Sequence, residues 1–167
     1  MDSALQLQTV TFGPCRIIGM RYVGDGLNNE IGQLWDQFCA RMNEIDKPEQ
    51  PAGFGVCRCA PGASGRFGDY VAAVTAVTAK DDARVPEGMT ALDLPRATYA
   101  VFTVPEIPEV RNVWRSSLAA IDSSAEWKRY SCGPAGCTCT THPAFEYYPP
   151  EYRGAGPFFI YVPLKPE

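Results

Sequence analysis

The chain has 167 residues, 46% hydrophobic and 20% charged, which excludes a largely disordered protein and allows one domain with its own core. Its formal net charge is −4 and it has no dense run of lysine and arginine, so nucleic acid is not expected as a direct partner. No window approaches the roughly 18 apolar residues of a membrane span, and the first ten residues lack the pattern of a signal peptide. We therefore expect a cytoplasmic protein without a membrane partner.

The first half of the sequence predicts a strand, a helix and two further strands. Residues 15–23 form the first strand candidate, and apolar side chains at helical spacing predict an amphipathic helix over residues 30–45. Two more strand candidates follow at residues 54–59 and 67–77, with a glycine-rich turn between them. Residues 78–89 are polar, contain proline and glycine, and are predicted to connect the two halves.

The second half repeats this order. A strand is predicted over residues 97–104, a helix over residues 110–121, and two strands over residues 145–148 and 158–164, which flank a Pro/Gly loop. The first helix contains Ile-x-x-Leu-Trp and the second Val-x-x-Val-Trp at matching positions, although such short patterns also recur by chance.

We therefore predict one α+β domain over residues 1–167, with duplicated βαββ halves of about residues 1–78 and 90–167. Two sheets and two main helices, related by a pseudo-twofold axis, are expected to surround a central ligand cleft.

Five short segments, spread over nearly the whole chain, have a common precedent. They are residues 34–35 (LW), 70–73 (YVAA), 95–102 (PRATYAVF), 145–148 (FEYY) and 160–164 (IYVPL). In their order and spacing they resemble the GyrI-like small-molecule-binding domains, which are the effector-binding domains of some AraC-type and MerR-type bacterial regulators. The resemblance implies the duplicated fold and a central pocket in which a glutamate at the position of Glu146 meets lipophilic cations among aromatic side chains.

Glu146 is the candidate that the residues themselves also single out. Side chains alternate along a strand, so Glu146 should share one face with Tyr148, while Phe145 and Tyr147 share the other. A carboxylate among aromatic rings is costly to bury unless it is paired. A bound cation would supply that pair and would also be attracted to the ring faces. The alternative is an edge-strand glutamate that faces water.

The other candidate ligand-binding residues are aromatic, because tyrosine and tryptophan combine apolar area with one polar group. Tyr161 is expected beside Glu146 in the sheet. Trp35 and Trp114 lie on the helical stripes, where tryptophan is more often a plain core residue. The predicted set is Glu146, Tyr148, Tyr161, Tyr70, Tyr99 and Trp114.

Two classes of function fit these residues. The first is a stand-alone binding protein, without a cofactor, that sequesters or reports a lipophilic, cationic or aromatic compound. The second, implied by the resemblance, is a hydrolase of cyclopropane-bearing alkylating natural products, in which Glu146 would activate a water and Tyr161 or Tyr70 would stabilise developing charge. A protein partner is also conceivable, but the sequence does not identify one.

The chain contains seven cysteines, which we expect to be reduced thiols. Cys132, Cys137, Cys139 and His142 lie within eleven residues of one another and could in principle hold zinc or copper. Against the GyrI-like pattern, residues 132–141 look like a Cys-rich insertion before the glutamate strand. The spacing of the four candidate ligands fits none of the common zinc patterns, so we expect no metal and interpret the segment as a loop with free thiols. A single histidine also excludes a three-histidine catalytic metal site.

Overall fold

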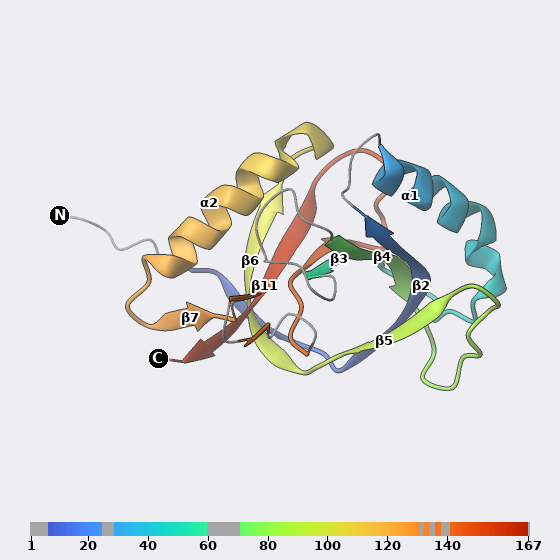
Figure 1. The fold of residues 1–167 in the computed structure, drawn as a ribbon, viewed down its shortest axis with the longest axis horizontal. Helices are drawn as coiled ribbons and strands as arrows, with labels where there is room; N and C mark the ends of the chain where they lie inside the picture. The colour runs from blue at the N-terminus through green and yellow to red at the C-terminus, as the bar shows by residue number, and fades with distance from the viewer. Residues whose placement is uncertain are drawn as a thin grey trace.

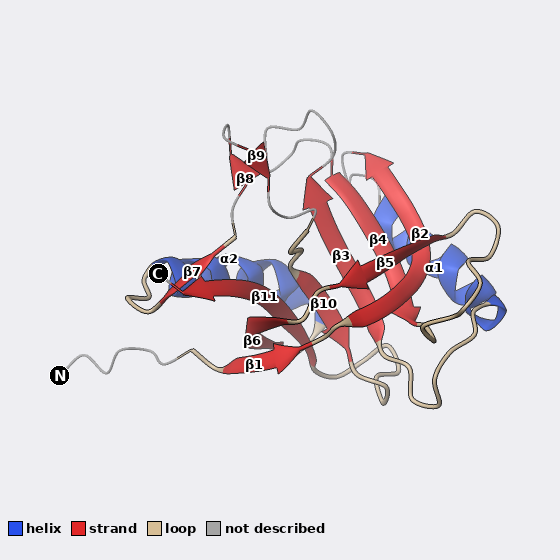
Figure 2. Ribbon diagram, turned by 90° about the horizontal axis from the view of Figure 1, so that it is seen from below, coloured by secondary structure: helices blue, strands red, loops and turns tan. Residues whose placement is uncertain are grey.

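One strongly curled sheet of nine antiparallel strands, with two helices on one of its faces, makes up the fold (Figure 1). The computed structural model describes residues 7–24, 29–59, 71–130, 132–133, 136–137 and 141–166. Figure 2 shows both helices behind the sheet when the molecule is seen from below. This architecture confirms the predicted α+β fold class with two main helices. Among the described residues, no helix is long and apolar enough to cross a membrane.

The predicted order of strand, helix, strand and strand is present twice. The first half contains β2 (Cys15–Gly24), α1 (Glu30–Arg41), β3 (Gly53–Cys59) and β4 (Val71–Thr78). The second half contains β6 (Ala97–Val104), α2 (Val110–Asp122), β10 (Phe145–Tyr148) and β11 (Phe158–Pro166). The first helix is shorter than predicted, because a 3-10 turn, η1 (Met42–Glu44), replaces its last turn; a similar turn, η2 (Ile107–Glu109), precedes α2.

Five short strands of the described chain were not predicted from the sequence. Strands β1 (Thr9–Phe12) and β5 (Thr90–Leu94) precede the two halves, and β7 (Trp127–Arg129) follows α2. A separate two-stranded ribbon pairs β8 (Cys132–Gly133) with β9 (Gly136–Cys137).

The two predicted sheets are in fact one, because β3 of the first half pairs with β10 of the second. The strand order β1-β6-β11-β10-β3-β4-β2-β5 is symmetric about this pair, with the corresponding strands of each half at equal distances from it. The short strands exchange halves: β1 pairs with β6, and β5 pairs with β2. The halves therefore meet edge to edge rather than face to face, which corrects the expected arrangement and confirms the pseudo-twofold relation.

The buried side chains form three clusters. One lies on the face of the sheet opposite the helices and includes Phe54 of β3 and Phe145 of β10. The other two lie on the helix face, one beneath α1 around Phe38 and one beneath α2 around Ile121. The helix face over β3 and β10 lies between these two clusters, so that the pseudo-twofold axis passes through a region that neither helix covers alone.

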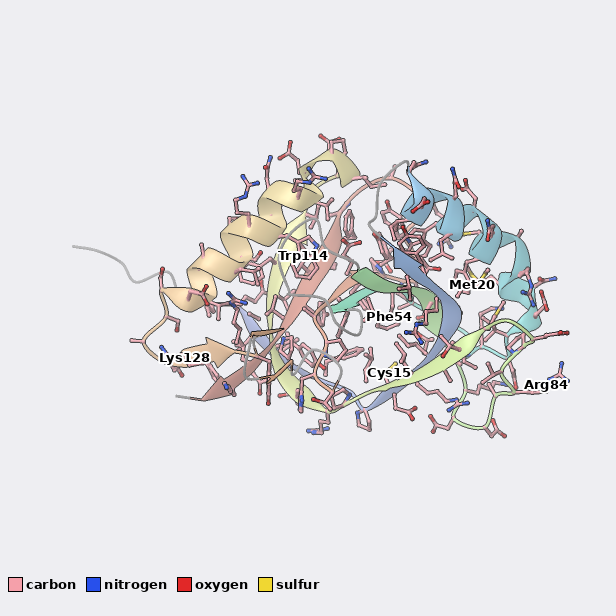
Figure 3. The ribbon with its side chains drawn as sticks, in the orientation of Figure 1. Cys15, Met20, Phe54, Arg84, Trp114 and Lys128 are labelled. Atoms are coloured by element: carbon pink, nitrogen blue, oxygen red, sulfur yellow. The ribbon has the colours of Figure 1, made fainter. Side chains whose placement is uncertain are left out.

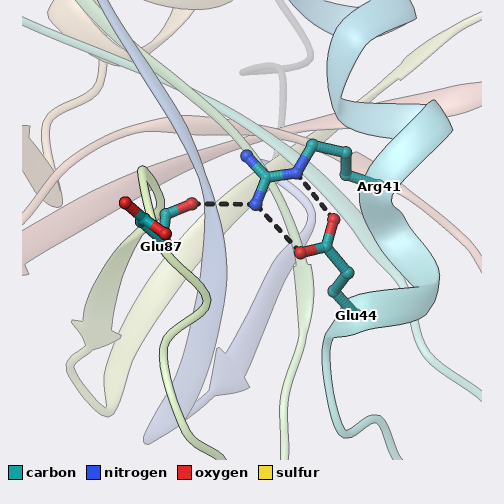
Figure 4. A network of polar contacts seen from close by, with 3 residues as sticks. All are labelled: Arg41, Glu44 and Glu87. Atoms are coloured by element: carbon teal, nitrogen blue, oxygen red, sulfur yellow. Dashed lines mark hydrogen bonds and ion pairs between the residues drawn. The ribbon is translucent and has the colours of Figure 1, made fainter.

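The C-terminal end of α1 is tied to the connection between the halves by an exposed network (Figure 4). The Arg41 guanidinium donates two hydrogen bonds to the Glu44 carboxylate, at 2.6 and 2.9 Å, and one to the carbonyl oxygen of Glu87 at 2.8 Å. Arg41 and the hydrogen bonds it donates lower the pKa of Glu44. Exposed ion pairs add little stability, so the network fixes the position of the connection more than it stabilises the fold.

Two ionisable groups of the cluster on the face opposite the helices, Cys15 and Tyr99, are expected to lower the free energy of unfolding at alkaline pH. Burial, with a smaller contribution from Asp81, raises the pKa of the Cys15 thiol from 9.0 to about 11, and burial also raises the pKa of Tyr99 from 10.0 to about 12. Both groups are largely neutral in the folded and unfolded chain below about pH 8. Above this the unfolded chain ionises first, so the free energy of unfolding should fall as pH rises from about 9 to 11.

The measurement is the urea midpoint between pH 8 and pH 11. We expect Cys15→Ala to show a shallower decline than the wild type, because it removes the thiol whose ionisation favours the unfolded chain. Cys39→Ala is the comparison: burial and Asp36 also raise the pKa of this exposed thiol, but by less than for Cys15, so its replacement should change the slope less. Equal slopes for the wild type and Cys15→Ala would contradict the assignment.

Candidate functional site

The two central strands present an unusual set of side chains to the helices. On β10 these are Glu146 and Tyr148, and the register places Glu146 opposite Gly55 and Tyr148 opposite Gly53 of β3. We call these four residues the central strip. Phe54 and Phe145, their neighbours in the chain, belong to the cluster on the opposite face. The alternation predicted for Glu146 and Tyr148 is therefore confirmed.

The glycines of the central strip leave space on the helix face of β3, because they have no side chains. A Cβ atom built at Gly55 would lie 3.2 Å from Oε2 of Glu146 and 3.6 Å from the Trp35 ring, and one built at Gly53 would lie 3.3 Å from Cβ of Tyr148. Glycine weakens a strand interior and commonly marks a place where another group approaches closely. Here it leaves room for the carboxylate and for a tryptophan ring from α1.

Glu146 is half-buried and accepts two hydrogen bonds from neutral donors. The Trp114 indole N–H of α2 donates to Oε1 at 3.1 Å, and the Tyr148 hydroxyl donates to Oε2 at 2.7 Å. The salt bridges between residues that the structure describes do not include Glu146. The carboxylate is thus fixed in place, with each oxygen held, while its negative charge is not neutralised by a lysine or arginine of the described chain.

The two helices supply one tryptophan each to the central strip. Trp114 comes from α2 and lies on the side of that helix that faces the sheet (Figure 3). Trp35 comes from α1 and meets the Tyr148 ring edge to face, with ring centroids 5.4 Å apart and planes at 75°. These are the two tryptophans at matching positions in the helical stripes, so the duplicated sequence pattern brings one indole to the Glu146 carboxylate and the other to the Tyr148 ring.

Further rings extend the site beyond Tyr148. The Phe158 ring of β11 stacks on Tyr148 with centroids 4.7 Å apart, and the Tyr152 ring, from the loop after β10, lies 5.1 Å from Tyr148. An anionic oxygen pair surrounded by ring faces and edges is suited to a cation with an apolar body, because coulombic and cation–π attraction act together.

The structure brings three of the six predicted residues together: Glu146, Tyr148 and Trp114. Tyr161 and Tyr99 lie on the opposite face, which corrects the expected place of Tyr161 beside Glu146. Tyr161 pairs with Phe145 and stacks on it, and the β11 residue opposite Glu146 is Ile160. Tyr99 is fully buried in the same cluster as Phe145 and donates a hydrogen bond to the carbonyl oxygen of Pro95. Tyr70 lies outside the described residues.

Five residues of the site are not in the predicted set: Trp35, Gly53, Gly55, Tyr152 and Phe158. Trp35 was assigned to the core, and its spacing match with Trp114 was the signal that could have placed it here. Gly55 could be recognised only once its strand neighbour was known. Tyr152 lies in a loop rich in proline and glycine, where no periodicity predicts the direction of a side chain.

The Cys-rich segment gives no metal site within the described residues. Cys132 and Cys137 lie opposite one another in the backbone register of the β8–β9 ribbon, and Cys139 lies outside the described residues. The His142 ring stacks on Tyr130, with centroids 4.3 Å apart. In the described part of the chain no three His, Cys, Asp or Glu residues are grouped to hold a metal ion.

A hollow of about 350 Å³ lies elsewhere, lined by Pro14, Cys15, Arg16, Asp81 and Asp93. Its thiol is a poor nucleophile, because burial and the nearby Asp81 raise the pKa of Cys15 to about 11. The hollow shares no residue with the central strip, which has the stronger case as a ligand site.

Comparison with known proteins gives one family match and one curated relative. The family described as integron-associated effector binding protein matches residues 10–164. Transcriptional regulator BrlR of Pseudomonas aeruginosa is 34% identical over 143 residues, which cover 83% of this chain and 46% of BrlR. The chain therefore spans about half the length of this relative.

Solved structures share the fold. An integron cassette protein from the mobile metagenome of Vibrio cholerae has a TM-score of 0.62 at 15% identity, with 96% of this chain and 97% of that chain covered. SAV2435, solved bound to tetraphenylphosphonium, has a TM-score of 0.63 at 15% identity, with 96% and 94% covered. At these identities the structures establish a common fold and no more.

Proposed function

The chain belongs to the family of integron-associated effector binding proteins, with the GyrI-like fold, and we propose that it binds lipophilic cations at the central strip, with Glu146 as the counter-charge. Binding of a small molecule is the property that the family name describes. The class of ligand and the residues that hold it are our proposal.

One observation carries the proposal. Glu146 is half-buried, its oxygens are held by Trp114 and Tyr148, and no cationic side chain of the described residues forms an ion pair with it. A carboxylate in such surroundings is costly unless a positive charge approaches it. A delocalised or quaternary cation fits well, because it needs no hydrogen-bond acceptor and gains from the surrounding rings.

The ligand bound to SAV2435 supports the same class of compound. Tetraphenylphosphonium carries one positive charge within four apolar rings, and a protein of the same fold holds it. The protein would act by sequestering such a compound or by reporting its presence to a partner. We expect no direct contact with nucleic acid, since the net charge is −4.

The experiment compares two ions of nearly equal shape and opposite charge. Tetraphenylphosphonium and tetraphenylborate are titrated separately into the wild-type protein by isothermal calorimetry. We expect measurable binding of the phosphonium and binding of the borate that is at least tenfold weaker, because the same rings then face a charge that Glu146 repels. Equal affinities would show that the site, if any, recognises apolar area alone and would overturn the cationic assignment.

A further inference from the structure

The loop between β10 and β11 places one tyrosine hydroxyl in an unusual position. The backbone N–H of Tyr152 donates to the carbonyl oxygen of Pro149 at 2.8 Å, which closes a turn directly after β10. Gly154 and Gly156 then adopt positive φ angles of 85° and 92°, which glycine tolerates best. These turns direct the Tyr152 ring back onto the cluster beneath α2 rather than into solvent.

The hydroxyl oxygen of Tyr152 is buried and has no hydrogen-bond partner among the residues that the structure describes. Buried polar groups in folded proteins are nearly always paired with protein or ordered water, so an orphan hydroxyl requires an explanation. The ring itself is well packed: it lies 5.1 Å from the Tyr148 ring and 5.9 Å from the Phe158 ring, centroid to centroid. Packing therefore accounts for an aromatic residue at this position, but a phenylalanine would serve equally.

The neighbours of Tyr152 show why its hydroxyl stays unpaired. Within the central strip, Tyr148 links Tyr152 to Glu146: its ring contacts Tyr152, and its hydroxyl donates to Glu146. The two oxygens of Glu146 are held by Tyr148 and Trp114 and accept nothing from Tyr152. Burial first, and the charge of Glu146 second, raise the pKa of Tyr152, so this hydroxyl stays protonated and keeps its donor.

We propose that the Tyr152 hydroxyl is a second polar contact for the ligand of the central strip, and that it donates a hydrogen bond to a neutral acceptor on that ligand. This inference rests on the proposed function. It adds a specificity-determining residue and a chemical requirement: besides its cationic centre, the preferred ligand carries an ether or carbonyl oxygen. Because Tyr148 contacts both Tyr152 and Glu146, this oxygen is separate from the cationic centre.

The test uses a series of triphenylphosphonium cations that carry one straight side chain. In each member a different methylene of the chain is replaced by an ether oxygen, and the all-carbon chain is the reference. Affinities are measured calorimetrically for the wild type, Tyr152→Phe and Tyr147→Phe. Tyr147 lies on the same strand as Glu146 but packs against Phe12 and Phe54 on the opposite face, so it is the matched control.

We expect one oxygen position at which Tyr152→Phe weakens binding about fivefold, the effect of one neutral hydrogen bond, while the all-carbon cation changes less than twofold. Tyr147→Phe should leave the whole series unchanged. The melting temperature of Tyr152→Phe should be equal to that of the wild type or higher, since an unpaired buried hydroxyl is removed.

Three results would overturn the inference. In the first, Tyr152→Phe changes the affinity of every cation by the same factor, and in the second it changes none of them. In the third, its melting temperature falls by several degrees, which would assign the hydroxyl a structural role. Each of these leaves cation binding intact, whereas failure of the wild type to bind any member of the series would refute the proposed function together with this inference.

Discussion

Replacement of Glu146 by glutamine is expected to weaken the binding of tetraphenylphosphonium about thirtyfold. The substitution keeps the size and planarity of the side chain and removes its charge. Two unit charges roughly 7 Å apart, at the effective dielectric constant of about 20 that suits partly buried groups, attract one another by about 2 kcal/mol. This attraction corresponds to a factor of about 30 in the dissociation constant.

The substitution also alters the hydrogen bonds that hold the side chain. Trp114 donates to one oxygen of Glu146 and Tyr148 to the other. A glutamine amide offers one oxygen and one N–H₂ group, so one of the two donors loses its acceptor. We expect a loss of about 1 kcal/mol in the free energy of unfolding, which leaves the protein folded and the binding measurement interpretable.

Glu151→Gln is the matched control. Glu151 is exposed, lies five residues further along the chain and acts electrostatically on Tyr147, which packs on the other face of the sheet. Its replacement removes the same formal charge and should change the affinity less than twofold. Calorimetric titration of both variants, with thermal melts as the folding control, tests the prediction. If both variants lost affinity equally, the loss would reflect the net charge of the protein and would contradict a specific role for Glu146.

The same pair of variants tests the hydrolase alternative. A cyclopropane-bearing alkylating compound is incubated with the wild type, Glu146→Gln and Glu151→Gln, and ring-opened product is quantified by mass spectrometry. A binding protein gives no product above the buffer rate with any of the three. Product formation by the wild type and Glu151→Gln that is absent with Glu146→Gln would assign the protein to the hydrolases instead.

Periodicity within one strand predicted which side chains share a face of the sheet, but it did not predict how neighbouring strands align. Alternation within residues 145–148 correctly placed Glu146 and Tyr148 on one face. It could not place Tyr161, because the face of a residue on a neighbouring strand depends on the register, and a shift of one residue reverses every side chain. The observed register sets Tyr161 opposite Phe145, and so on the other face.

The sequence could not predict that the two halves form one sheet, or that β1 and β5 each pair with the other half, for a different reason. Strands β1 and β5 have four and five residues, too few for a clear pattern, and each pairs with the first strand of the other half. Local propensity carries no information about such pairing. The long elements were predicted well because their stripes have one dominant period: α2 was expected over residues 110–121 and spans Val110–Asp122.

Replacement of Gly19 by alanine is expected to destabilise the fold by about 3 kcal/mol or more, the range of severe overpacking. Gly19 lies within β2, which has β4 on one side and β5 on the other, and it pairs with Ala76 and Thr90. A Cβ at this position would lie 1.8 Å from the carbonyl oxygen of Thr75 and 2.5 Å from Cα of Ala76. Both are backbone atoms, so no side-chain rotation relieves the contact.

Gly55→Ala provides the contrast, because the nearest atom to its new Cβ is the terminal Oε2 of Glu146, at 3.2 Å, which can move by a few tenths of an ångström. We expect this variant to change the free energy of unfolding by less than about 1 kcal/mol. Urea unfolding of both variants, with the wild type as reference, measures the difference. Similar stabilities for Gly19→Ala and the wild type would mean that β2 and β4 do not approach one another as closely as the curvature of this sheet requires.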